Sequence, residues 1–331
     1  MSTGDTGDTG LLGAYLLDGK GGAKKLDWSG VRAWTPADGK LWLNLDYTLR
    51  DVAEWLDKDS KIDPLMREAL VEEDPRPRAI VHGDDLFLIV RGINMNQDST
   101  PEDMISVRCW VETDRVITMR HRLSRTLKSL ATDVERGAGP RNPADVASML
   151  VERVVEHVTT RVDQLGDAIS SCEDELIVET PKGDLRGRLA EHRRRAIALR
   201  RFLSPQREAM TKLTAIDQLP WFDQAHRDRI AEAANQMART VEELDAARDR
   251  AAVTQEELAS RLTEMTNRRL YVLSIITAVF LPLGFVCALL GVNIGGIPFK
   301  NADWAFWVLC SLFVVGVGLQ LWYFRKRGWF G

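Results

Sequence analysis

The sequence predicts an α/β cytoplasmic domain, built as a mixed sheet with flanking helices, followed by a long stalk helix and two C-terminal transmembrane helices. Three observations predict this fold class. Short apolar runs alternate with turn residues up to residue 141, helix-breaking residues are nearly missing between residues 223 and 290, and two late stretches carry no charge. The chain is therefore a polar body joined to an apolar tail.

Composition narrows the class of protein. The chain has 331 residues and a formal net charge of −4, which argues against nucleic acid as a partner, because phosphate binding needs clustered excess Lys and Arg. Residues 1–10 are polar, acidic and Gly-rich, so we expect a disordered N-terminus and no secretory signal. Four scattered cysteines predict neither a disulfide framework nor a zinc site, and we expect small buried side chains at Cys109, Cys172, Cys287 and Cys310.

Residues 11–141 are predicted to form the α/β domain. The sequence HGDD at 82–85 lies between two β-rich runs and predicts a hairpin, and TDR at 113–115 predicts another. Helical spacing of apolar residues predicts helices in the interspersed segments DVAEWLDK, DPLMREALVEE and RLSRTLKSLATDVERG.

Residues 142–222 are predicted to be a cytoplasmic helical region. Asn142 is the expected N-cap of its first helix, with Pro143 at the first helical position. Further along, Ser204 and Pro205 are expected to restart the helix, and Pro220 marks the last break before the stalk.

The helical region contains a charged hairpin. A basic helix, LRGRLAEHRRRAIALRRFL, follows an acidic arm, so the two charges can face each other across antiparallel helices, or the acidic arm is simply a solvated face. The acidic residues are Asp163, Asp167, Glu173, Asp174, Glu175 and Glu179.

Residues 223–290 are predicted to form one helix of about 65 to 70 residues, roughly 100 Å long, whose last part, 271–290, spans the membrane. Residues 304–323 form the second span, with aromatic residues at both ends. The loop 291–303 contains one Lys, whereas basic residues precede the first span and fill the tail 324–331, so the positive-inside rule places both termini in the cytoplasm. No monomeric globule buries such a stalk, which implies oligomerisation.

An ion pathway would follow one stripe of the stalk helix at spacings of three and four residues. Such a stripe, ending at Gly291, is small or hydroxyl-bearing in the span apart from its leucines, and it is polar below the membrane. Close helix packing in a membrane produces the same composition, so both interpretations stay open. The stripe consists of Glu256, Ser260, Thr263, Asn267, Leu270, Ser274, Thr277, Leu281, Gly284 and Ala288.

The loop after the first span supplies candidate oxygen ligands. In several copies of the chain, the carbonyls of Gly291, Val292 and Asn293 and the Asn293 amide can form a ring that contacts a hydrated cation. An ordinary C-cap and turn is the alternative interpretation. The spans contain no His, Asp or Glu, and the five histidines show no metal-ligand spacing, so we expect the ion to pass largely hydrated.

This pattern resembles the CorA family of divalent cation transporters, and it is similar to the ZntB branch. The resemblance rests on the GVN tripeptide at 291–293, on RRFLSPQREAMTKL at 200–213, on LPWFDQAHRDRI at 219–230 and on LPLGF at 281–285. It implies a CorA-like funnel: a homopentamer in the bacterial inner membrane, lined by the first span. The implied cargo is Zn²⁺, with other divalent cations as alternatives, and no catalytic cofactor.

The loop after the first span lacks the net negative charge that would attract cations. FKNADW places one Lys and one Asp in each copy, so a ring of copies carries no net negative charge, and Asp303 remains as the local attractor.

Two other functions stay open: a CorA-type channel for magnesium, cobalt or nickel, and a membrane-anchored scaffold or signalling protein. No GxSxG, Walker or dinucleotide motif is present, so we expect no enzyme. The direction of transport and any coupling to protons are not determined by the residues.

Overall fold

The computed structural model describes residues 9–96, 99–100, 102–177, 183–291, 302 and 304–327. The chain divides into two compact units, Met1–Gln255 and Glu256–Gly331. The first unit contains the sheet and most of the helices. The second contains the end of the longest helix and one further helix.

The first unit is built on a seven-stranded mixed sheet with the order β2-β1-β3-β7-β6-β5-β4. β3 and β7 pair in parallel, and every other neighbouring pair is antiparallel. The predicted mixed sheet is thus confirmed. Its strands are β1 (Leu11–Leu17), β2 (Ala23–Lys25), β3 (Lys40–Asp46), β4 (Arg78–His82), β5 (Asp85–Gly92), β6 (Ile105–Val111) and β7 (Arg115–Arg120).

Both predicted hairpins are present. β4 and β5 pair through the HGDD turn, with His82 opposite Asp85, and Gly83 adopts a positive φ of 62° there. β6 and β7 pair around the TDR turn, with Val111 opposite Val116. A residue without a β-carbon is suited to the left-handed conformation of the first turn, so local turn chemistry supports the register of that hairpin.

Helices cover both faces of the sheet, which explains why the central strands are apolar on both sides. On one face, Val52 and Trp55 of α2 and Leu70 of α3 join a core with Leu43 and Ile117. On the other, α5 (Pro143–Ile177) packs on β3, β5, β6 and β7. The short helices of this unit are α1 (Trp28–Ala33), the 3₁₀ turn η1 (Pro36–Asp38), α2 (Arg50–Lys58), α3 (Pro64–Val71) and α4 (Arg125–Glu135).

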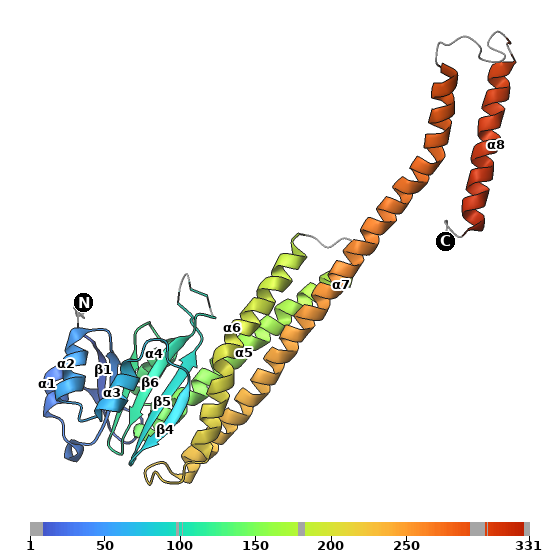
Figure 1. Ribbon diagram of the computed structural model, residues 1–331. Helices are drawn as coiled ribbons and strands as arrows, with labels where there is room; N and C mark the ends of the chain where they lie inside the picture. Colours follow the sequence, from blue (N-terminus) through green and yellow to red (C-terminus); the bar gives the residue numbers. More distant parts are fainter. Residues whose placement is uncertain are drawn as a thin grey trace. The chain divides into compact units, whose positions relative to one another are not determined.

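Three long helices complete the first unit: α5 (Pro143–Ile177), α6 (Leu185–Thr214) and the first part of α7 (Gln224–Gly291) (Figure 1). The Asn142 side chain accepts a hydrogen bond of 2.8 Å from the backbone N–H of Asp145, as expected of an N-cap. Thr159 of α5 and Thr240 of α7 lie 2.8 Å apart through their hydroxyls.

The expected restart at Ser204 and Pro205 is wrong, because α6 continues through Pro205. Tertiary contacts hold the helix on both sides of the proline. The Gln206 side chain accepts a 2.6 Å hydrogen bond from the backbone N–H of Arg91, and the Arg91 guanidinium lies 4.4 Å from the Phe202 ring centroid. Packing on β5 therefore outweighs the local preference of proline to end a helix.

The expected pairing of the acidic arm with the basic helix holds for one residue of the arm. Glu175 forms an ion pair with Arg188 of α6, whereas Glu173 turns to Arg250 of α7. Asp163, Asp167 and Asp174 are exposed, in line with a solvated face, and Glu179 lies outside the described residues. Two of the arm's charges thus tie α5 to two different helices.

The cysteines divide by location. Cys109 and Cys172 are buried, as expected, whereas Cys287 is exposed and Cys310 is half-buried. The last two lie in the apolar helices, which have little protein cover in a single chain.

His226 joins the start of α7 to the start of α5. Its Nδ1 lies 2.6 Å from Asp223 Oδ1 and its Nε2 lies 3.1 Å from Asp145 Oδ1, and the ring stacks on Phe222. Asp145 also forms an ion pair with Arg229, which donates two hydrogen bonds to the Glu152 carboxylate. The hydrogen bond to Asp145 raises the pKa of His226, and burial opposes it. The bonds from His226 also lower the pKa of Asp145 and Asp223.

This geometry predicts a pH-dependent stability. A raised folded-state pKa means that His226 stabilises the fold fully below its unfolded pKa of about 6.5 and that the contribution is lost as pH rises through the folded pKa. We expect His226→Gln to cost about 1–2 kcal/mol near pH 6, with Asp223 partly screened by solvent, and less at alkaline pH. Thermal unfolding of the full chain in detergent, measured across this range, checks the difference.

The matched control for this test is His192→Gln. Burial lowers the pKa of His192, so protonation of this side chain destabilises the fold as pH falls below the unfolded pKa. The cost of His192→Gln should therefore shrink toward low pH, which is opposite to the trend expected for His226→Gln. A cost of His226→Gln that stays constant with pH would contradict the assignment.

Candidate functional site

The end of α7 and α8 (Ala305–Lys326) are long and apolar enough to cross a membrane. The apolar stretches of both helices lack burial within the chain. A core helix of a soluble protein would be covered by protein, so these surfaces require lipid or other copies of the chain.

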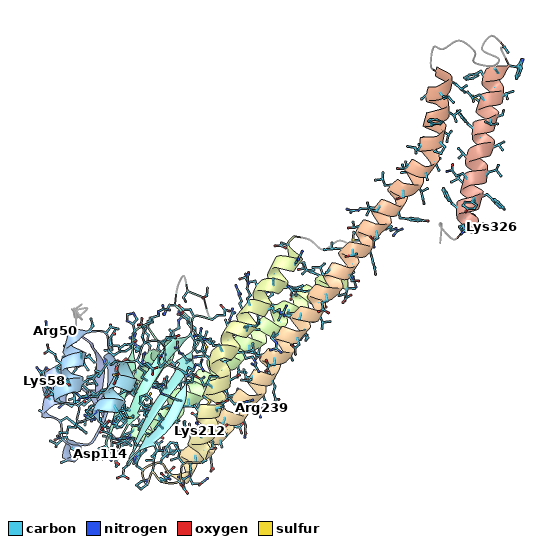
Figure 2. The ribbon with its side chains drawn as sticks, in the orientation of Figure 1. Arg50, Lys58, Asp114, Lys212, Arg239 and Lys326 are labelled. Atoms are coloured by element: carbon cyan, nitrogen blue, oxygen red, sulfur yellow. The ribbon has the colours of Figure 1, made fainter. Side chains whose placement is uncertain are left out.

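The C-terminal end of α8 carries interfacial anchors. Lys326, labelled in Figure 2, lies 5.3 Å from the centroid of the Trp322 ring, and Arg327 lies 5.5 Å from that of Tyr323. Aromatic rings and basic side chains are typical of a helix that reaches a membrane surface. The observed helix extends three residues beyond the span predicted at 304–323 and into the basic tail.

All ten residues of the predicted pathway stripe lie on α7 and are exposed in the single chain. In the span, the less exposed residues form a different face, which repeats at helical spacing and packs toward α8: Ile275, Ala278, Val279, Leu283 and Val286. On a helix of 3.6 residues per turn, the stripe from Ser274 to Ala288 lies about 150° from that face. The stripe is therefore on the side of the span that α8 leaves uncovered.

A hollow of about 950 Å³ lies over part of this stripe. Its lining comes from α7 alone and includes Thr277, Leu281 and Gly284 of the stripe. Walls from a single helix do not enclose a pathway. Another copy of the chain, or lipid, must close it.

The stripe's hydroxyl groups are oriented by their own helix. Thr263, Ser274 and Thr277 each donate a hydrogen bond of 2.8–2.9 Å to the backbone carbonyl four residues earlier. Because the hydroxyl proton is used inside the helix, the oxygen presents only lone pairs outward. Such oxygens suit the water molecules around a hydrated cation.

The predicted outer mouth lies mostly outside the described residues. Gly291 is the last residue of α7 and is exposed. Val292, Asn293 and Asp303 lie outside the described residues. Within the described ranges, no group of three or more His, Cys, Asp or Glu side chains is placed to hold a metal ion.

One polar residue of the spans was missed from the sequence. Gln320 of α8 donates a 2.6 Å hydrogen bond from Nε2 to the backbone carbonyl of Ala278 in α7. Two signals were available: Gln320 is the one amide side chain of the second span, and Ala278 precedes Pro282 by four residues.

The fold and the two spans define the class, that of a CorA-type membrane protein. The solved structure of full-length CmaX superimposes with a TM-score of 0.85 at 33% identity, covering 98% of this chain and 99% of that one. The CorA magnesium transporter of Methanocaldococcus jannaschii has the same fold, with a TM-score of 0.78 at 16% identity over 96% of this chain and 98% of its own.

The chain belongs to the family of CorA-like Mg²⁺ transporter proteins, which matches residues 37–326. The zinc transport protein ZntB of Pectobacterium carotovorum subsp. carotovorum (strain PC1) is 34% identical over 97% of this chain and 96% of its own length. The divalent cation transporter CmaX of Pseudomonas aeruginosa is 33% identical over 99% of this chain and 100% of its own length. The resemblance to the CorA family and to ZntB proteins is confirmed.

The stripe predicts a difference in water access between neighbouring residues. Ala288 belongs to the stripe and Leu289 does not, although both are exposed in the single chain at the same depth. In a chain with Cys287→Ser and Cys310→Ser, we expect Ala288→Cys to react with a membrane-impermeant thiol reagent at least about tenfold faster than Leu289→Cys, because only thiols in contact with water ionise and react readily. Labelling in intact membranes checks this.

The control for that test is the cysteine-substituted parent, which must not be labelled in its spans. Equal labelling at the two positions would contradict a water-filled stripe and favour close packing of helices.

Proposed function

We propose that several copies of this chain assemble in a bacterial inner membrane into a pathway for divalent metal cations, with Zn²⁺ as the favoured cargo. The exposed stripe of α7 carries the proposal, since its outward lone pairs lie on the face that α8 leaves free. Family membership and the names of the relatives support it. The homopentamer and the cytoplasmic location of both termini are parts of the same proposal.

The proposed outer mouth consists of Gly291, Val292 and Asn293, with Asn293 as the residue that contacts the metal's hydration shell. Carbonyl and amide oxygens repeated around an axis would replace or bind the water molecules of the ion. Asp303 supplies a local attraction, since the nearby Lys300 cancels the net charge of the loop.

The mouth is tested by Asn293→Ala in purified protein reconstituted into liposomes. We expect zinc uptake to fall about 10- to 100-fold, as when a group that orients a metal's ligands is removed. Uptake is measured with an entrapped zinc-sensitive dye.

Asn301→Ala is the matched control, because it removes the same side chain from the same loop without touching the tripeptide. Zinc uptake that persists in Asn293→Ala would argue against this mouth, and a wild-type protein that carries no ion would favour a scaffold instead.

Magnesium transport is the second candidate, favoured by the description of the family itself. Val292 stands at the centre of the tripeptide, where the magnesium branch of the family carries Met and this chain departs from it. We expect excess Mg²⁺ to leave zinc uptake within about twofold of its value, because the tripeptide with Val292 is similar to that of the ZntB branch and departs from that of the magnesium branch. Strong competition by Mg²⁺ in the same liposomes would favour the magnesium candidate. Running the assay with and without a pH gradient tests coupling to protons.

A further inference from the structure

Pro282 leaves a backbone carbonyl of α7 without its usual partner. The helix continues through Pro282 to Gly291. Because proline has no backbone N–H, the carbonyl four residues earlier, that of Ala278, receives no hydrogen bond from the helix. Within a bilayer no water is available to replace it, so the group must find a partner in protein.

Gln320 is that partner. Its Nε2 donates to the Ala278 carbonyl at 2.6 Å, from α8 to α7. Gln320 is half-buried, and its amide would itself be costly if it faced lipid unpaired. One bond therefore satisfies a polar group on each span.

Tight packing does not hold the two spans together at this level. A hollow of about 400 Å³ lies between them, lined by residues of both helices that include Pro282, Gly316 and Gln320. A β-carbon added at Gly316 would meet no heavy atom within 4 Å. An apolar side chain contacts lipid tails about as favourably as it contacts another helix, so apolar contacts alone do not fix the register of the two spans. A specific hydrogen bond therefore helps to set the register here.

The bond lies next to the pathway stripe along α7. Ala278 follows Thr277 and Pro282 follows Leu281, and both preceding residues are in the stripe. A rotation or shift of α7 at this level would therefore move Thr277 and Leu281 with it.

We propose that Gln320 is a positioning residue for ion transport: by holding the carbonyl that Pro282 releases, it sets the rotation of the pathway-lining span against α8. The role in transport rests on the proposed function. The contact itself does not.

The test is a double-mutant cycle with Gln320→Leu and Pro282→Ala. In the Pro282 background, Gln320→Leu leaves the Ala278 carbonyl unpaired, and we expect zinc uptake to fall roughly three- to tenfold, with a lower thermal unfolding midpoint in lipid nanodiscs. In the Pro282→Ala background, the restored N–H of residue 282 takes the carbonyl. The same substitution should then lower zinc uptake by less than about twofold and leave the unfolding midpoint nearly unchanged.

Gly316→Ala is the control, since it alters the same hollow from α8 without touching the bond, and we expect wild-type values. Equal losses from Gln320→Leu in the two backgrounds would overturn the proposal, as would wild-type uptake in Gln320→Leu itself. A wild type without zinc flux would overturn the proposed function and the positioning role with it, while the unfolding midpoints would still report on the Gln320–Ala278 bond.

Discussion

A helix that begins in a water-soluble bundle and ends in a bilayer passes through two surroundings. Its backbone must be hydrogen-bonded internally along the whole length, whereas its side chains must suit water at one end and lipid at the other. α7 does this in 68 residues. Internal hydrogen bonds serve the backbone in both solvents, which is why a helix is suited to the transition. Its side chains change from ion-pairing residues, such as Arg250 with Glu173, to an exposed apolar surface around Phe280 and Leu281.

Prolines show how this constraint is met in the two solvents. Pro205 interrupts the hydrogen bonds of α6 in the water-soluble unit, where Arg201, four residues earlier, is exposed and its carbonyl can be hydrated. Pro282 interrupts those of α7 in the span, and on the side of the span that faces α8, away from the pathway stripe, a side chain of α8 takes the carbonyl. The same local defect thus needs only packing support in one case and a dedicated donor in the other.

The polar contacts of the first unit tie α7 to its neighbours at separate levels. His226 and Arg229 bind Asp145 and Glu152 of α5, and Arg250 binds Glu173 further along. Pairs of this kind are individually weak when exposed, so their joint effect is to specify how α5 and α7 align. This gives the acidic arm a structural role for Glu173 and Glu175, while its remaining described carboxylates face solvent.

Much of this architecture was determined by the sequence alone, because it depends on local chemistry and on one-dimensional patterns. Turn residues set both hairpins, Asn142 caps α5, and uncharged length defines the spans. The family follows from motifs that stay together in the chain, such as the tripeptide beginning at Gly291.

Only the tertiary structure decided what depends on partners distant in sequence. It carried α6 through Pro205, directed Glu173 to α7 instead of α6, and placed the stripe on the face opposite α8. It also paired Gln320 with Ala278, a contact across 42 positions. The physical reason is the same in each case: a local preference of a few kcal/mol yields to whichever distant group satisfies a buried polar atom or completes a packed face.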